Sequence, residues 1–142
     1  RAPSKSAPQE VDPNSPRDAG YRLPRVVTDL CGARPIDLAI IDGVETMTGG
    51  EGPWTTGLAL AKPGVLIAGL NPVSTDAVCT AIMGFDPMAA GGTSTFRAVD
   101  NMLELAERAG LGTRRLGEIE VAGAAIADVT YPFGPLGAPT AV

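Results

Sequence analysis

Two runs of apolar residues dominate the hydropathy pattern of the chain. The first, Ile36–Asp42, is too short and too rich in β-branched residues for a helix, and it is apolar on both faces after Asp37. The second, Val65–Leu70, follows a Lys62-Pro63-Gly64 turn. Continuous apolarity is typical of strands buried between two layers, as in parallel sheets. The pattern therefore predicts two neighbouring buried strands.

Helical spacing of apolar residues marks three further segments. The first covers residues 24–31, with Pro24 at its first position and one apolar face formed by Val26, Val27, Leu30 and Cys31. The second starts at Pro72 after Asn71 as N-cap and continues to Gly84. The third begins between residues 93 and 95 and runs to Ala109, where Gly110 caps it. Its apolar stripe consists of Phe96, Val99, Leu103 and Ala106.

Two shorter segments are less distinctive. Residues 57–62 are apolar, and their length fits either a helical turn or an edge strand. In residues 116–121, Ile119 and Val121 alternate with Glu118 and Glu120. That alternation predicts a strand with one solvated face.

Together these segments predict an α/β fold, a three-layer sandwich-like unit with a small, mainly parallel sheet flanked by helices. The chain has 142 residues, of which 44% are hydrophobic, and this is enough for one domain with a real core. We expect a flexible proline-rich segment over residues 1–20, a single α/β domain over residues 21–130, and a loose tail over residues 131–142.

Composition excludes several functions. The chain is acidic, with a formal net charge of −5 and no clustered basic stripe, which argues against a nucleic-acid partner. The adjacent Arg114 and Arg115 follow a helix end, where cations offset the helix dipole. No apolar run is long enough to span a membrane. The sequence leaves the compartment open.

The chain contains no histidine, and its two cysteines, Cys31 and Cys79, form no CxxC motif. A zinc site of thiolates and imidazoles, a Ser-His-Asp triad and a Cys-His pair are therefore excluded within this chain. The two cysteines fit one disulfide or two buried thiols equally well.

The candidate chemistry lies where the two predicted strands end. Asp42 ends the first strand and Asn71 follows the second. Because the carboxyl ends of parallel strands meet at one edge, ligands of open α/β sheets bind there. We expect that edge to bring together four carboxylates, those of Asp42, Glu45, Glu51 and Asp76.

Carboxylates without histidine or thiolate are hard oxygen ligands that suit Mg²⁺, Mn²⁺ or Ca²⁺. The predicted metal ligands are Asp42, Glu51 and Asp76. The predicted catalytic carboxyls are Asp76 and Glu45. A small anionic substrate would be bound by Gly49, Gly50, Gly52, Asn71 and Thr75. The alternative is structural: a turn at Asp42, solvated Glu45 and Glu51, and a helix-dipole role for Asp76.

Several motifs occur in an order that resembles a known family. They are Asp37-Leu38-Ala39-Ile40-Ile41-Asp42-Gly43, Gly50-Glu51-Gly52-Pro53, Gly64-Val65-Leu66-Ile67-Ala68, Asn71-Pro72-Val73-Ser74-Thr75-Asp76-Ala77-Val78 and Met83-Gly84-Phe85-Asp86-Pro87. From about Pro24 to Gly123 the chain resembles the C-terminal part of the domain-of-unknown-function family 362. By motif position, the characteristic family residues are Asp42, Gly50, Gly52, Pro53 and Asp76.

The resemblance implies an association with four-iron, four-sulfur ferredoxin segments, to which members of that family are often linked. Two cysteines cannot supply four thiolates, so we expect no iron–sulfur cluster within this chain. A redox role would need a ferredoxin-like partner or a missing upstream domain. Because the chain begins at Arg1 and not at methionine, it resembles a fragment, a processed form or a trimmed form of a protein, and the sequence leaves open whether upstream residues complete the fold or the site.

Two functional hypotheses follow. In the first, the acidic edge binds a divalent cation and a small anionic substrate, as an enzyme or a metal-dependent binding domain. In the second, the chain is a non-catalytic accessory or interaction module of an iron–sulfur redox system, and its acidic edge receives a basic partner surface.

Overall fold

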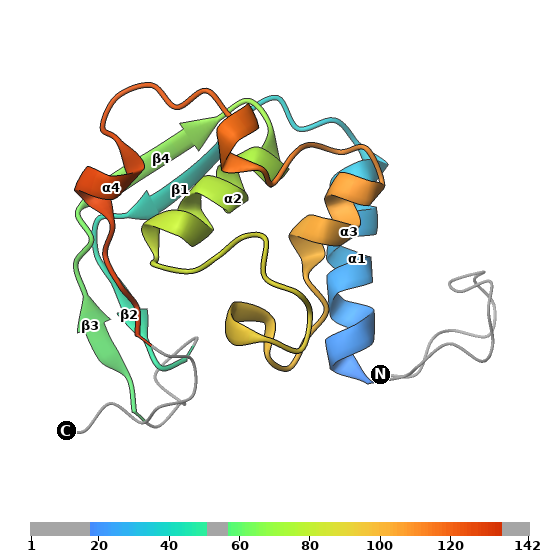
Figure 1. Ribbon diagram of the computed structural model, residues 1–142, viewed down its shortest axis with the longest axis horizontal. Helices are drawn as coiled ribbons and strands as arrows, with labels where there is room; N and C mark the ends of the chain where they lie inside the picture. The colour runs from blue at the N-terminus through green and yellow to red at the C-terminus, as the bar shows by residue number, and fades with distance from the viewer. Residues whose placement is uncertain (1–17, 51–56, 135–142) are drawn as a thin grey trace.

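The computed structural model describes residues 18–50 and 57–134 (Figure 1). This part of the chain combines helices with two small antiparallel sheets. The elements in chain order are α1 (Ala19–Ala33), β1 (Ala39–Gly43), β2 (Thr46–Thr48), β3 (Ala59–Ala61), β4 (Val65–Gly69), α2 (Pro72–Ile82), the 3-10 helix η1 (Ser94–Phe96), α3 (Met102–Arg108), the 3-10 helix η2 (Leu116–Glu118) and α4 (Ile126–Val129). None of the described helices is long and apolar enough to cross a membrane.

The strands form one bent ribbon. β1 pairs with β4, with Gly43 opposite Val65, and β2 pairs with β3, with Thr46 opposite Ala61. The segment between β3 and β4 has one residue more than the segment between β1 and β2 that lies opposite it, as in a β-bulge. Gly64 lies at that bulge with a φ of 72° and donates its N–H to the Val44 carbonyl at 3.3 Å. Glycine accommodates this conformation without strain.

The prediction of a mainly parallel sheet is wrong, because both strand pairs are antiparallel. A parallel pair needs a crossover connection, usually a helix, whereas antiparallel strands need only a turn. Here the connection between β1 and β4 contains β2 and β3, which continue the same ribbon. Residues 46–48 form a strand of this ribbon, and residues 57–62, which fitted either a helical turn or an edge strand, contain a strand.

Helix α2 packs on one face of the β1–β4 sheet (Figure 1). The approach is close at Gly69, where a Cβ would lie 2.1 Å from the Thr75 hydroxyl oxygen. Within the described part of the chain, no helix covers the opposite face. The exposed residues of β1 and β4 alternate with less exposed ones, so the sheet is buried on one side only.

The first helix is longer than its apolar pattern indicated. α1 begins at Ala19, and the side chain of Asp18 caps it by accepting the N–H of Tyr21 at 2.9 Å. Pro24 lies inside the helix and has no N–H for the carbonyl of Gly20, four residues earlier. That carbonyl instead accepts the N–H of Asp100 at 3.0 Å. The proline is thus tolerated because a distant turn satisfies the freed acceptor.

The face that α1 buries also differs from the prediction. Val26, Val27 and Leu30 are exposed, whereas Pro24 and Thr28 are buried where α1 packs against α3. Thr28 donates its hydroxyl to the Pro24 carbonyl at 2.8 Å, which lets a polar side chain occupy this interface. Cys31, the fourth residue of the predicted apolar face, packs against the core, so only part of that face is covered within the described residues.

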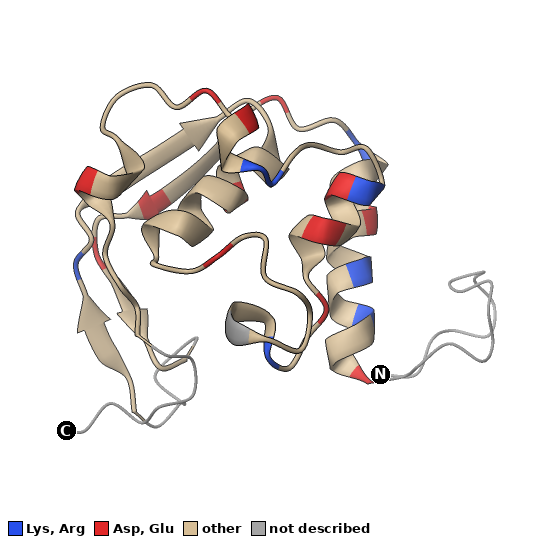
Figure 2. Ribbon diagram, viewed as in Figure 1, with Lys and Arg blue, Asp and Glu red and all other residues tan. Residues whose placement is uncertain are grey.

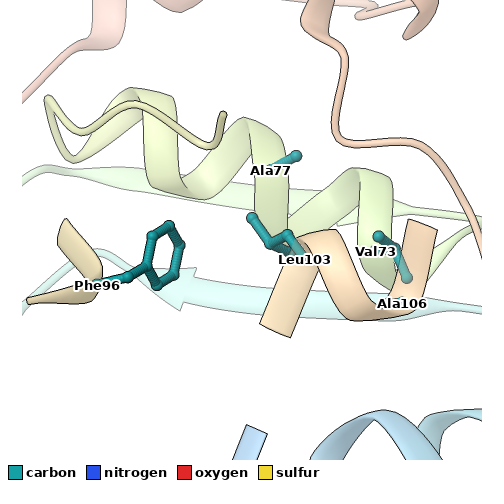
Figure 3. Packing of buried hydrophobic residues seen from close by; sticks show 5 residues of the cluster. All are labelled: Val73, Ala77, Phe96, Leu103 and Ala106. Atoms are coloured by element: carbon teal, nitrogen blue, oxygen red, sulfur yellow. The ribbon is translucent and has the colours of Figure 1, made fainter. Parts of the chain in front are cut away.

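The hydrophobic core lies between α2, η1 and α3 (Figure 3). It is formed by Val73, Ala77, Phe96, Leu103 and Ala106. The predicted stripe of the third helix is confirmed as a core contribution, although the helix is not continuous. Residues 97–101 separate η1 from α3, and Asn101 caps α3 by accepting the N–H groups of Leu103 and Glu104.

The strand predicted over residues 116–121 is absent. Residues 116–118 form η2, in which Glu118 donates its N–H to the Arg115 carbonyl at 2.8 Å. A strand needs a pairing partner, and none of the described strands lies beside this segment. The domain boundaries at residues 20 and 130 stay a prediction.

Candidate functional site

The antiparallel pairing separates the two strand ends that the sequence placed together. Asp42 lies near the end of β1, where Leu66 of β4 is its partner, while Asn71 follows the other end of β4. The two residues therefore lie at opposite ends of the paired strands. Within residues 18–50 and 57–134, acidic residues are spread over helices, strands and loops and do not gather at one edge (Figure 2). The prediction of a shared acidic edge relied on parallel strands, so the antiparallel pairing leaves it without a geometric basis.

Two of the predicted acids have local roles in the strand ribbon. One carboxylate oxygen of Asp42 accepts the N–H of Val44 at 3.0 Å, which is an Asx turn. Glu45 forms an exposed ion pair with Lys62 at 2.6 Å, across the bulge. Glu51 and Gly52 lie outside the described residues. Exposed ion pairs contribute little to stability, so neither contact explains more than local order.

Gly49 and Gly50 have positive φ values of 87° and 156°. A Cβ on Gly49 would lie 2.3 Å from the carbonyl oxygen of Gly57, so the backbone at Gly49 packs closely against the backbone at Gly57. The glycine at position 49 is thus required by backbone contact. A role for these glycines in binding an anion stays a prediction.

Asn71 and Thr75 are engaged within the fold at the start of α2. The amide oxygen of Asn71 accepts the N–H of Ser74 at 3.0 Å, which confirms the predicted N-cap, and its amide nitrogen donates to the Leu111 carbonyl at 2.7 Å. The Thr75 hydroxyl is buried and donates to the Asn71 carbonyl at 2.7 Å. The polar atoms proposed to bind a substrate thus already have partners.

Asp76 is the predicted site residue with the most distinctive surroundings. An apolar cavity of about 50 Å³ lies between α1, α2 and α3 and has Asp76 in its lining. The other lining residues are Val27, Thr28, Cys31, Pro72, Val73, Met102, Leu103 and Ala106. Such a volume holds roughly one or two water molecules or a small chemical group. Asp76 itself remains accessible to solvent.

The carboxylate of Asp76 has no hydrogen-bond or ion-pair partner among residues 18–50 and 57–134. Only its main-chain carbonyl is engaged, by the hydroxyl of Thr80 at 2.8 Å. Partial burial raises the pKa of the Asp76 carboxyl above its ordinary value. With Asn71 as N-cap, Asp76 falls in the second turn of α2, where the helix dipole has largely faded. A dipole role therefore does not account for this aspartate.

The neighbouring thiol of Cys79 is affected by the same surroundings. Burial, and then the negative charge of Asp76, raise the pKa of the Cys79 thiol. Its sulfur lies 4.0 Å from the sulfur of Met83. The thiol therefore stays protonated at neutral pH, which is unfavourable for a nucleophile or a metal ligand. Both cysteines are free thiols, so they do not form the disulfide that the sequence left open.

Sequence reasoning missed a buried ionic network around Arg114. The guanidinium of Arg114 is buried and lies 3.3 Å from Glu107 and 3.6 Å from Glu104, both on α3. It also donates to the Pro87 carbonyl at 3.3 Å. The tight turn at Gly110 returns the chain over α3 and brings Arg114 to these acids. The sequence does contain a signal for this network: two acids three residues apart on a helix, followed by a glycine and then by two arginines.

No group of three or more cysteine or acidic side chains in the described part of the chain could hold a metal ion. The predicted set of Asp42, Glu51 and Asp76 includes one residue outside the described range, so the set as a whole stays a prediction. What the described residues provide is a single carboxylate without a partner beside an apolar cavity.

The described elements define a small α/β unit in which a helix covers one face of an antiparallel ribbon. The model of the domain of unknown function family 362 (DUF362) matches residues 4–81, more than half of the chain. The chain therefore belongs to this family, which confirms the predicted relationship. The match ends at residue 81, so the predicted extension of the resemblance to Gly123 stays a prediction. Neither the curated proteins nor the solved structures contain a match.

Proposed function

We propose that this domain binds a small ligand at the Asp76 cavity, where the Asp76 carboxylate holds a hydrated divalent cation that in turn binds an anionic substrate. The observation that carries the proposal is the carboxylate of Asp76, which has no partner among the described residues and lines an apolar cavity. A partly desolvated carboxylate without a counter-charge gains more from a cation than a fully hydrated one does.

One protein carboxylate is sufficient for some cations. Mg²⁺ usually keeps several of its waters and is bound by one or two carboxylates together with substrate oxygens. In the proposed site Asp76 is the protein ligand, and the small apolar cavity receives an apolar part of the substrate. The predicted roles of Asp42 as a metal ligand, of Glu45 as a base and of Gly49 and Gly50 as anion contacts stay predictions that this cavity does not use, because none of these residues lines it. Glu51 and Gly52 lie outside the described residues.

The proposal is tested by calorimetric titration of the full chain with Mg²⁺, Mn²⁺ and Ca²⁺. We expect the wild type to bind at least one of these ions and Asp76→Ala to lose that binding. Asp128→Ala is the matched control, because Asp128 is an exposed aspartate on α4, away from the cavity lining. Equal binding by the wild type and Asp76→Ala would contradict the proposal, as would loss of binding in both variants.

The pH dependence of binding provides an independent check. Because the pKa of Asp76 is raised, protons compete with the cation at a higher pH than for an ordinary aspartate. We therefore expect affinity to fall as the pH decreases toward that raised pKa. An affinity unchanged between pH 7 and pH 4 would show that the ion binds elsewhere.

The alternative is a non-catalytic accessory module for an iron–sulfur redox system. The predicted acidic edge that would receive a basic partner does not form in the described residues, because the acids are dispersed (Figure 2). This alternative gains support if the metal titrations give no heat and the chain co-sediments with a ferredoxin that carries four-iron, four-sulfur clusters.

A further inference from the structure

The Asp76 cavity has an apolar floor and a charged mouth. Val73, Leu103 and Ala106 line it, and each of them is at most 5% exposed. All three belong to the hydrophobic core, so close packing fixes their positions (Figure 3). Val27 and Asp76, by contrast, are exposed residues of the lining. The cavity therefore opens to solvent beside the carboxylate and ends at the core.

The lining offers little to a polar group. The hydroxyl of Thr28 already donates to the Pro24 carbonyl at 2.8 Å. Cys31 contributes a thiol, which is only a weak hydrogen-bond donor. A polar or charged group that entered the cavity would lose its hydration without an equivalent replacement. The cavity therefore favours an uncharged, apolar part of a ligand.

The volume of the cavity limits the size of that apolar part. It is about 50 Å³. Apolar cavities of about 150 Å³ hold a benzene molecule, so a third of that volume holds about two carbon atoms. An ethyl group therefore fits, whereas the outer carbons of a longer chain stay in water.

The charges at the mouth favour a singly charged ligand. Among the described residues, no lysine or arginine lines the cavity. The Asp76 carboxylate and a divalent cation together leave one positive charge, which one carboxylate of a ligand neutralises. A phosphate monoester carries close to two negative charges at neutral pH and would leave an uncompensated negative charge beside Asp76.

We propose that the substrate of this site is a short aliphatic carboxylate, whose carboxylate binds the cation at Asp76 and whose tail of about two carbon atoms occupies the cavity. This inference rests on the function proposed above, because without a cation Asp76 repels an anion. It adds the chemical class of the substrate. Propionate is the simplest member of that class.

The length of the tail is tested by calorimetry on the full chain, saturated with whichever of Mg²⁺, Mn²⁺ and Ca²⁺ it binds. The probes are sodium formate, acetate, propionate and hexanoate. Each buried methylene raises affinity about fourfold, so propionate should bind about fifteenfold more tightly than formate. Hexanoate should gain less than about twofold over propionate, because its outer carbons stay in water. Equal affinities for formate and propionate, or an affinity that keeps rising to hexanoate, would overturn the proposal.

A substitution that fills the cavity tests where the tail binds. Ala106→Val extends a floor residue by roughly the bulk of an ethyl group. We expect this variant to retain cation binding and to lose the preference for propionate over formate. Ala109→Val is the matched control, because Ala109 is exposed at the C-cap of the same helix and does not line the cavity. A folded Ala106→Val that still prefers propionate would overturn the proposal.

Methyl NMR of the unmodified chain locates the tail without a substitution. Propionate should shift the signals of Val73 and Leu103, while those of Leu60 on β3 should not change. Unchanged Val73 and Leu103 signals at saturating propionate would show that the tail binds elsewhere.

The two proposals fail in different ways. A wild type that binds none of the three cations overturns both of them. Cation binding that depends on Asp76 but is followed by no preference for tail length leaves the proposed function intact and overturns the substrate class.

Discussion

At the scale of single residues, partners within the fold decide which charged groups are constrained. Arg114 is buried and is neutralised by Glu104 and Glu107. Burial alone would raise the pKa of Glu107, but hydrogen bonds from Arg114 and Thr113 and the charge of Arg115 outweigh it and lower that pKa below its ordinary value. Asp76, by contrast, has a raised pKa and no described partner. The two carboxyls illustrate how opposite surroundings shift the pKa of the same chemical group in opposite directions.

The Glu107 network predicts a specific response to acid. Because the folded-state pKa of Glu107 is lowered, its ionised form stabilises the fold above the unfolded-state pKa of about 4.3, and this contribution is lost as the pH falls through the lower folded-state value. Glu107→Gln should therefore be less stable at pH 7 and should lose less stability on acidification. Urea unfolding at pH 7 and pH 3 measures both effects. Parallel stability–pH curves for the two proteins would contradict the assignment.

At the scale of elements, capping residues determine where the helices begin and end. Asn101 is buried and ends the turn before α3. Its amide oxygen accepts two N–H groups of α3, and its amide nitrogen donates to the carbonyls of Pro87 and Ala89 at 3.0 and 2.8 Å. At the other end of α3, the N–H groups of Gly110 and Leu111 satisfy two terminal carbonyls. One side chain thus joins a helix start to a preceding loop.

Substitution at Asn101 separates the contribution of the capping oxygen from that of the amide donor to the preceding loop. Asn101→Ala removes the cap and leaves buried carbonyls without donors, so we expect a loss of about 2–4 kcal/mol in the free energy of unfolding. Asn101→Ser retains a capping oxygen but lacks the amide donor, and we expect roughly half of that loss. Chemical denaturation of the three proteins measures the difference. Identical losses for Ala and Ser would show that the cap itself contributes nothing.

At the scale of the whole molecule, contacts between distant segments hold the layers together. α1 is anchored at Gly20, whose carbonyl accepts the N–H of Asp100 and whose Cα approaches Ala98 closely. Nearby, Arg25 pairs with Asp100 at 2.6 Å and stacks 3.4 Å above the ring centroid of Tyr21. These contacts join the first described helix to the turn that precedes α3. The tertiary arrangement therefore depends on a position without a side chain.

The same substitution at two positions of α1 tests this anchor. A Cβ at Gly20 would lie 2.2 Å from the Ala98 carbonyl oxygen, so Gly20→Ala should cost about 1–3 kcal/mol. A Cβ at Gly32 would meet Leu111 at an ordinary 3.4 Å, and Gly32→Ala should be neutral or stabilise by up to about 1 kcal/mol. Thermal unfolding compares the two. Equal effects would contradict a tight contact at Gly20.

The sequence by itself determined the features that depend on neighbouring residues. Asn71 and Pro72 predicted the start of α2, Gly84 predicted its end, and the run from Val65 predicted β4. The core stripe of Phe96, Leu103 and Ala106 and the family relationship were also predictable. Caps, turns and helical periodicity depend on residues a few positions apart, so they can be predicted without knowledge of the fold.

Only the tertiary structure decided how the segments are placed relative to one another. The direction of β4 against β1, and with it the separation of Asp42 from Asn71, depends on pairing between residues far apart in the chain. The same holds for the early start of α1 and the burial of Arg114. An apolar run is equally compatible with a parallel or an antiparallel neighbour, and with one buried face or two. That choice rests on long-range packing, which local patterns do not encode.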